Sequence, residues 1–324
     1  MSGTSELRTW WTQRPPATGA AVMATGILSV GLHLTGYGVL SRIALALTAA
    51  AWLGLVVDVG VRVLWERDRW AQQALTAAAL APVAATATLG TGVSMQGGRP
   101  LAEALLALAF ALWVGLLLPV ALRWERPMPG AVFLGCVATQ GVAVLAALLG
   151  ATVGTAWLVH TALVLFWLGL VFYLIGLRCF DLRQTATGAG DHWIAGGALA
   201  ISALAGSRLV AAGHSGRYLW SNDDKNVLRG VTLALLVLAL VFYCVLAAAE
   251  LLRPRLRYDT RRWSTVFPLG MTAVASLSVA ATRGVSWLRG LGEVLLWIAV
   301  AVWCVVLAGA VSSILGGLRS RAPR

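Results

Sequence analysis

Apolar segments long enough to cross a membrane follow one another along almost the whole chain, separated by short polar stretches. We place ten of them near residues 18–40, 43–62, 74–97, 102–122, 130–150, 156–177, 191–212, 229–250, 263–282 and 292–315. Most are close to the ~20 residues that a helix needs to cross about 30 Å of hydrocarbon. The pattern predicts an all-α integral membrane protein: a ten-helix transmembrane domain over 18–315, preceded by an N-terminal segment (1–17) and followed by a C-terminal tail (316–324).

Successive segments differ in side-chain size. Odd-numbered segments are rich in Ala, Gly, Ser and Thr, as in APVAATATLGTG and MTAVASLSVAAT, whereas even-numbered ones are bulky, as in LVLFWLGLVFYLIGL. Most bulky segments end in an arginine cluster such as LRWER. This unit recurs about five times with a period of roughly 55–75 residues, which is a repeat of pattern rather than of identity. We therefore expect five helical hairpins.

The small odd segments have two possible interpretations. Small side chains let helices pack closely, and Ser or Thr hydroxyls can also face a water-filled path. If the bulky helices face lipid, the odd helices line a central pore. The candidate pore-lining residues are Thr25, Gly26, Ser29, Pro82, Thr86, Thr88, Thr139, Gln140, Ser202, Met271, Val274 and Ser276. The alternative is that these segments only pack tightly and that each hydroxyl bonds to its own helix backbone.

Basic residues indicate the orientation. With the N-terminus in the cytoplasm, 17 of the 25 lysines and arginines lie on the cytoplasmic side and 8 on the external side. Cytoplasmic loops of membrane proteins carry such an excess, so we expect both termini to be cytoplasmic. An even number of spans agrees.

Composition supports the membrane assignment and narrows the partners. The chain is 59% hydrophobic and 12% charged, with mean hydropathy +0.81, whereas a soluble domain carries about 25% charged residues. The net charge of +12 is explained by arginines that flank the spans, so no nucleic-acid partner is expected. A single lysine among the 25 basic residues, with abundant Ala and Gly, indicates a bacterial source. The expected location is therefore the bacterial cell (inner) membrane.

Acidic residues lie mostly in loops or at span ends, and Asp58, in an even segment, is the main exception. It either pairs with a nearby arginine or carries protons. Cation paths usually contain intramembrane carboxylates, so their absence from the odd segments agrees with an anion path, although a dry bundle would look the same. Arg208, near the external end of the seventh segment, either snorkels to the headgroups or attracts anions.

No enzyme motif is present. The sequence has no HExxH, Walker A or GxSxG motif. Its four cysteines form no CxxC pair, so we expect neither a zinc site nor a disulfide framework. The expectation is a protein that is not an enzyme and that uses no metal or cofactor.

A proline interrupts the ninth segment in the stretch WSTVFPLG at 263–270. Pro268 has no N–H to donate to the carbonyl of Ser264, so a bend is expected beside Phe267. The freed carbonyl is tolerated in a membrane where it faces a neighbouring helix or a wet cavity.

Two stretches, AAVMATGILSVGLHL near the start and WSTVFPLGMTAVAS in the ninth segment, resemble the tellurite-resistance/dicarboxylate transporter family. That family includes malate permeases, sulfite exporters and slow-type anion channels. The resemblance implies a homotrimer in which each protomer has its own pore, lined by the odd helices and blocked by a phenylalanine of the ninth helix. It also implies transport of small anions, such as C4-dicarboxylates, sulfite, tellurite-related oxyanions or inorganic anions, without a cofactor.

Carried onto this sequence, the resemblance makes Phe267, with Pro268 beside it, the pore gate. Phe267 follows Arg262 by five residues, which places it only about 7–8 Å into the membrane, so Met271 and Val274 are alternative occluding residues. Two other functions stay open: a proton-coupled dicarboxylate carrier, for which Asp58 is the visible protonatable group, and a non-transporting membrane sensor or scaffold.

Overall fold

The computed structural model describes residues 18–124, 127–181, 183–184, 190–213, 222–252 and 259–319. Ten long helices occupy these ranges: α2 (Thr18–Leu34), α3 (Gly38–Trp65), α5 (Ala81–Met95), α6 (Arg99–Ala121), α7 (Leu134–Val153), α8 (Ala156–Cys179), α10 (Trp193–Ala212), α11 (Asn222–Leu252), α12 (Trp263–Arg283) and α13 (Ser286–Arg319). Short 3-10 turns η1 (Ala77–Leu80), η2 (Gly130–Phe133) and η3 (Thr260–Arg262) lead into α5, α7 and α12, and a short helix, α4 (Arg67–Gln73), follows α3.

Within the described ranges, nine of these helices are long and apolar enough to cross a membrane, and α2 is a shorter apolar helix. The all-α membrane class and the ten segments are therefore confirmed. The predicted N-terminal segment, 1–17, lies outside the described residues, as do residues 320–324 of the predicted tail.

Several predicted boundaries were wrong. The first span was drawn to residue 40, but α2 ends at Leu34 and the chain turns at Gly36, whose φ of +89° is a conformation that favours glycine. Helices α11 and α13 begin at Asn222 and Ser286, before the predicted starts at 229 and 292. Polar residues extend both helices beyond their apolar runs.

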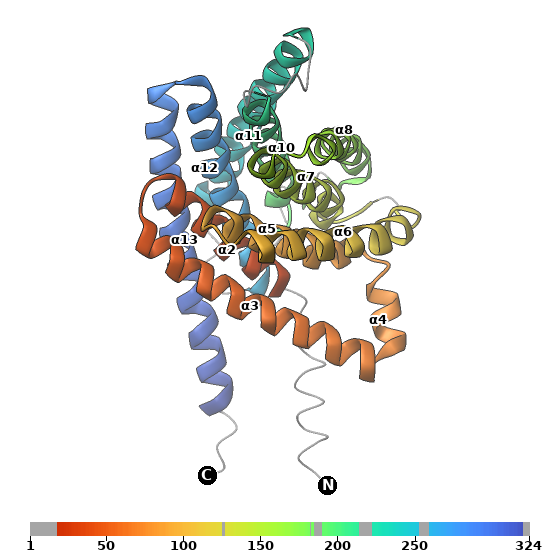
Figure 1. The fold of residues 1–324 in the computed structure, drawn as a ribbon. Coiled ribbons are helices and arrows are strands. Elements are labelled where there is room, and N and C mark those ends of the chain that lie inside the picture. Colours follow the sequence, from red (N-terminus) through yellow and green to blue (C-terminus); the bar gives the residue numbers. More distant parts are fainter. Residues whose placement is uncertain are drawn as a thin grey trace.

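Consecutive helices form five antiparallel hairpins: α2 with α3, α5 with α6, α7 with α8, α10 with α11, and α12 with α13 (Figure 1). Four hairpins have short internal turns at 35–37, 96–98, 154–155 and 284–285. We call the end of the bundle that carries these turns the turn end, and the opposite end, where one hairpin connects to the next, the linker end.

The first helix of each hairpin belongs to a closed ring. Helix α2 contacts α5, α5 contacts α7, α7 contacts α10, α10 contacts α12, and α12 returns to α2. We call these five the inner helices and their partners (α3, α6, α8, α11 and α13) the outer helices. This ring confirms the predicted arrangement of five hairpins with the odd helices inside.

Burial separates the two sets in the same way. In the most apolar window of each span, 67 to 94% of the residues are buried in α5, α7, α10 and α12, against 11 to 33% in the outer helices. The outer helices expose large apolar side chains such as Leu53, Leu118 and Leu174. Such surfaces are stable against lipid, whereas the small side chains of the inner helices allow their backbones to approach closely.

Three tryptophans of outer helices donate hydrogen bonds to inner helices of the next hairpin around the ring. The indole Nε1 of Trp52 (α3) donates to Thr86 (α5) at 3.0 Å, and that of Trp113 (α6) donates to Thr139 (α7) at 2.9 Å. Trp303 (α13) donates to Thr25 of α2 at 3.0 Å, which closes the ring from the last hairpin to the first. Each interhelical bond also satisfies an indole N–H that would otherwise lie unpaired in apolar surroundings.

Candidate pore

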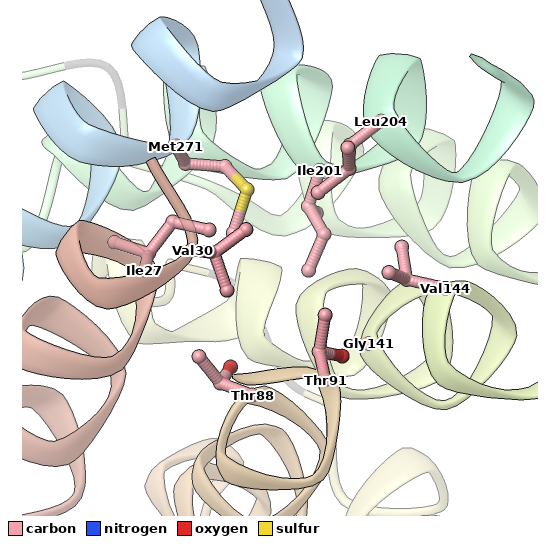
Figure 2. Close-up of a pocket in the computed structure, with 9 residues that line it drawn as sticks. All are labelled: Ile27, Val30, Thr88, Thr91, Gly141, Val144, Ile201, Leu204 and Met271. Carbon is pink, nitrogen blue, oxygen red and sulfur yellow. The ribbon is translucent and has the colours of Figure 1, made fainter. Parts of the chain in front are cut away.

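All five inner helices contribute to a small cavity at the centre of the ring (Figure 2). Its lining consists of Ile27 and Val30 of α2, Thr88 and Thr91 of α5, Gly141 and Val144 of α7, Ile201 and Leu204 of α10, and Met271 of α12. We call this the central cavity. Its volume is about 10 Å³, room for about one water molecule. The axis of the ring is therefore closed at this level to any anion larger than water.

The lining is mostly apolar. Thr88 and Thr91 carry its only hydroxyls, and each donates to the carbonyl four residues earlier in α5, at 2.8 and 2.9 Å. Each hydroxyl oxygen still has acceptor capacity, while its proton is committed to the helix backbone. In this closed arrangement the central cavity gives a dry constriction rather than a polar ion site.

Phe267 lies on the same side of α12 as the central cavity. Met271, which lines the cavity, follows it by four residues, and Val274 follows it by seven; residues at these spacings share one helix face. Phe267 is 2% exposed and is among the largest fully buried side chains of the described residues. It lies about one turn, or 6 Å, from Met271 toward the linker end. Val274 packs against Gly31 of α2.

Pro268 has a different neighbour. It lies inside α12, and its ring packs against Gly197 of α10, where an added Cβ would be 2.9 Å from Pro268 Cγ. Thr272 Oγ1 donates to the carbonyl of Pro268 at 2.9 Å. The proline therefore shapes the contact between two inner helices, and the adjacent Phe267 is the residue on the cavity side.

Three predicted pore-lining threonines lie at contacts between inner and outer helices. The hydroxyls of Thr25, Thr86 and Thr139 accept the tryptophan N–H groups and donate to carbonyls of their own helices at 2.7 to 2.9 Å. All of their hydrogen bonds are thus used away from the central cavity. Their pore-lining role stays a prediction.

Two other predicted lining residues, Ser29 and Gly26, lie where α2 contacts neighbouring helices. Ser29 Oγ donates to the carbonyl of Ser41 in α3 at 2.8 Å, and Ser41 Oγ donates back to the carbonyl of Ser29 at 2.9 Å. Gly26 lies where α2 approaches α5, and an added Cβ would be 2.8 Å from Thr88 Cγ2. These contacts join α2 to α3 and α5.

The remaining predicted lining residues also lie outside the lining of the central cavity. Gln140 Nε2 donates to the carbonyl of Phe166 in α8 at 3.0 Å. Ser202 Oγ donates to the carbonyl of Ala198 at 2.7 Å, and Ser276 Oγ to that of Thr272 at 2.8 Å. Pro82 lines a separate space between α3, α5 and α6. Of the twelve predicted lining residues, Thr88 and Met271 border the central cavity.

Seven of the nine lining residues were not predicted, although the sequence carries part of the signal for them. In α2, α5 and α7 the first Ala-Thr pair occurs at 24–25, 85–86 and 138–139, and the cavity-lining residues lie two and five positions after its threonine. Most of the predicted lining residues carry hydroxyl groups, whereas the residues that line the cavity are mainly apolar, with one glycine. Aligning the repeats on Ala-Thr identifies Ile27, Val30, Thr91, Gly141 and Val144, but not Ile201 or Leu204, because α10 has no such pair.

A family model described as a voltage-dependent anion channel matches residues 13–311. The chain belongs to this family. The match covers the whole ring of inner helices, including all nine residues of the central cavity. Membership supports transport of anions across a membrane and agrees with the resemblance noted from the sequence.

Two curated relatives are each named as an uncharacterized membrane protein of Mycobacterium tuberculosis, from strains CDC 1551 and H37Rv. Each is 29% identical over 119 residues, which is 35% of this chain and 59% of the relative. The chain therefore spans less than two thirds of the length of these relatives. Their names describe them as membrane proteins and give no substrate.

In this member of the voltage-dependent anion channel family, Asp58 lies away from the central cavity. It is on the outer helix α3, and Arg62 Nε donates to its Oδ2 at 3.1 Å, so the predicted pairing with a nearby arginine is confirmed. Arg62 also donates to Gln73 at 3.3 Å. These three residues border an apolar space of about 820 Å³ between α3, α5 and α6, which we call the lateral groove.

Carboxylates are absent from the five inner helices and from their 3-10 turns, as described in the structure. No group of three or more potential metal-ligating His, Cys, Asp or Glu side chains occurs among the described residues. The central cavity is accordingly lined by apolar residues and two threonines.

Proposed function

We propose that the protein conducts small anions across the bacterial cell (inner) membrane, along the axis of the ring of inner helices. The observation that carries the proposal is the central cavity, to which all five inner helices of a voltage-dependent anion channel family member contribute. A path surrounded by five helices without carboxylates disfavours cations. Widening of the same ring would open it to an anion.

Phe267 is the proposed gate. It is buried on the cavity side of α12, one turn from Met271, and its ring is larger than the side chains of Met271 and Val274, which follow it on that face. Met271 and Val274 continue the constriction toward the turn end. We propose that displacement of Phe267 is the step that opens the path, with Pro268 holding the adjacent backbone against α10.

A gated channel agrees better with the structure than a proton-coupled carrier. A carrier needs a protonatable group in its path, and Asp58 lies on an outer helix in an ion pair. The substrate class proposed here is a small anion, with C4-dicarboxylate, sulfite, tellurite-related oxyanion and inorganic anion as candidates to be compared. A sensor or scaffold without transport is the outcome that an absence of flux would favour.

The experiment is an anion-flux assay on purified protein in liposomes. Chloride, nitrate, sulfite and malate would be compared in the wild type and in Phe267→Ala, with and without a proton gradient. We expect the variant to conduct anions faster than the wild type, independently of the gradient, because the buried ring one turn from the central cavity is removed. Val266→Ala is the matched control, since Val266 is equally buried beside Phe267 but lies on another side of α12.

The outcomes separate the hypotheses. If Met271→Ala or Val274→Ala opens the path and Phe267→Ala does not, the gate lies one or two turns closer to the turn end. Wild-type flux that follows the proton gradient favours the carrier. No anion flux in any folded variant contradicts the transport function.

We also propose a homotrimer with cytoplasmic termini. The trimer is carried by the family resemblance and the orientation by the excess of arginines at the linker end. Light scattering of the purified protein would give its mass, and labelling of single cysteines placed in the hairpin turns would test whether the turn end is external. A monomeric mass or protected turns would contradict the respective proposal.

A further inference from the structure

Arg208 lies on the cavity side of α10. Leu204, which lines the central cavity, precedes it by four residues, and Ile201, which also lines the cavity, precedes it by seven. These spacings put the three side chains on one helix face. Arg208 is therefore above the constriction, about 6 Å from Leu204 toward the turn end.

Neighbouring contacts confirm this rotation of α10. Ser202 contacts α7, with its Oγ 3.7 Å from Cys136 Sγ. Ser207 contacts α12, with its Oγ 2.7 Å from Ser278 Oγ. Directions toward α7 and α12 are thus occupied by other residues, and Arg208 falls between them, toward the axis of the ring.

The guanidinium of Arg208 has unused donors. Its Nε and Nη2 atoms are buried and donate no hydrogen bond, and no carboxylate of the described residues forms an ion pair with it. A buried charge without a partner is costly, because it loses its hydration without a compensating interaction. A bound anion would supply both the missing charge and the missing acceptors.

The pattern of exposure indicates an open space beside Arg208. Between His192 and Val210 of an otherwise buried segment, Arg208 is the one residue that is half-buried, and Leu148 is a half-buried residue in the otherwise buried run of α7 from Leu134 to Gly150. Leu148 lies four residues after Val144, a cavity-lining residue. Leu148 and Arg208 therefore both lie on the cavity side of their helices, one turn from the central cavity toward the turn end.

In two further inner helices the corresponding positions fall in half-buried stretches near the turn end, 33–35 of α2 and the following turn and 93–96 of α5 and the following turn. Leu34 of α2 and Met95 of α5 lie four and seven residues after cavity-lining positions, and both are half-buried. The positions one turn beyond the cavity lining are therefore not fully buried on these four inner helices. We call the space bordered by Leu34, Met95, Leu148 and Arg208 the vestibule.

We propose that Arg208 binds a small oxyanion in the vestibule and loads it into the path above the central cavity. This inference rests on the proposed anion conduction. A guanidinium offers a planar fork of N–H donors that matches the two oxygens of a carboxylate or of nitrate, whereas a halide is a single acceptor atom that both branches must share at bent angles. The other three residues that border the vestibule are apolar, so the fork of Arg208 is the group that distinguishes one anion from another. The site thus selects planar oxyanions over chloride.

The test measures binding separately from transport. Sodium nitrate and sodium chloride would be titrated by calorimetry into the purified wild type, Arg208→Gln and Arg208→Lys, at an ionic strength held constant with a bulky sulfonate. Arg42→Gln is the matched control, since it removes an arginine from an exposed position on the outer helix α3, near the same end. Flux against nitrate concentration would be measured on the same proteins in liposomes.

We expect Arg208→Gln to raise the dissociation constant for nitrate at least about tenfold, the change that follows from losing one charge-assisted hydrogen bond. Arg208→Lys keeps the charge but loses the fork, so it should lose the preference for nitrate over chloride. Arg42→Gln should bind as the wild type does. The half-saturating nitrate concentration for flux should rise with the dissociation constant.

Wild-type affinity for nitrate in Arg208→Gln overturns the proposal, as does a wild type that binds no nitrate. Should Arg208→Gln fail to fold, an unchanged nitrate preference in Arg208→Lys would overturn it instead. Nitrate binding that depends on Arg208 without flux in any protein retains the site and removes the conduction function. Anion flux that is the same in the wild type and in Arg208→Gln retains the conduction function and removes the role of Arg208 in loading the path.

Discussion

The position of a threonine on its helix decides what its hydroxyl does. Thr86 and Thr88 are two residues apart in α5 and both donate to carbonyls of their own helix. Thr86 faces outward and accepts the indole N–H of Trp52, whereas Thr88 borders the central cavity. Threonine therefore joins two hairpins at position 86 and lines the candidate path at position 88.

We expect Trp303→Phe to destabilise the protein by about 0.5–2 kcal/mol, the range for one interhelical hydrogen bond in a membrane protein. The substitution removes the donor to Thr25 that joins the last hairpin to the first. Thermal unfolding of the purified protein measures the effect. Trp297→Phe is the control on the same helix, because Trp297 is partly exposed and makes an edge contact with Tyr37 that a phenyl ring can retain.

A double-mutant cycle makes this prediction specific. In a Thr25→Val background the effect of Trp303→Phe should shrink, because the acceptor is already absent. Full additivity of the two substitutions, or an equal loss in Trp297→Phe, would show that the hydrogen bond contributes nothing measurable.

Close approach between inner helices depends on particular glycines. Gly197 of α10 faces Pro268 of α12, and an added Cβ would lie 2.9 Å from the proline Cγ and 3.3 Å from its Cα. A proline ring is rigid, so it cannot move aside as a flexible side chain would. Two inner helices therefore meet beside the proposed gate at a spacing that only glycine allows.

Gly197→Ala should lower the free energy of unfolding by about 1–3 kcal/mol, the usual cost of overpacking. Gly115→Ala on α6 is the matched control, since an added Cβ there has no neighbour within 4 Å; it should be neutral or stabilise by about 0.5–1 kcal/mol, as expected for replacing a helix glycine. Unfolding temperatures of the two variants test the difference. Equal temperatures would contradict the tight contact between α10 and α12.

Across the whole molecule, acidic residues are distributed differently between the inner and the outer helices. The inner helices contain no carboxylate in their described residues, while the acidic residues of the spans belong to outer helices, as Asp58, Glu103 and Glu250 do. Arg208 adds a positive charge on the axis side. The ring therefore presents neutral or positive groups to anything that follows its axis.

For a channel of this kind, Asp58→Asn should leave anion flux intact and independent of a proton gradient. It should destabilise the protein by about 1–3 kcal/mol, because Arg62 loses its charged partner in a mostly buried position. Glu103→Gln provides the comparison: its pair with Arg99 has the same i,i+4 spacing but is about half exposed, so its loss should cost no more than about 0.5 kcal/mol. Flux and unfolding are measured on the same preparations, and loss of gradient-driven flux in Asp58→Asn would support the carrier instead.

The overall architecture could be predicted from the sequence because the membrane imposes it. Segment length follows from bilayer thickness, and the alternation of small and bulky segments indicates which helix of each hairpin is buried. Helix ends were less predictable. The turn at Gly36 and the polar extensions of α11 and α13 depend on local backbone conformation rather than on hydropathy.

The sequence by itself determined ten membrane-spanning segments, five hairpins, an inner set of small helices and the likeness to an anion-channel family. The tertiary structure alone decided which side of each inner helix faces the axis. It turned Thr25, Thr86 and Thr139 toward tryptophans of the outer helices, and it brought Ile27, Val144 and Met271 from three separate hairpins to one cavity. The physical reason is that the inner helices are small and apolar on every side, so no amphipathic pattern indicates their rotation; that rotation follows from interhelical contacts made between residues far apart in the chain.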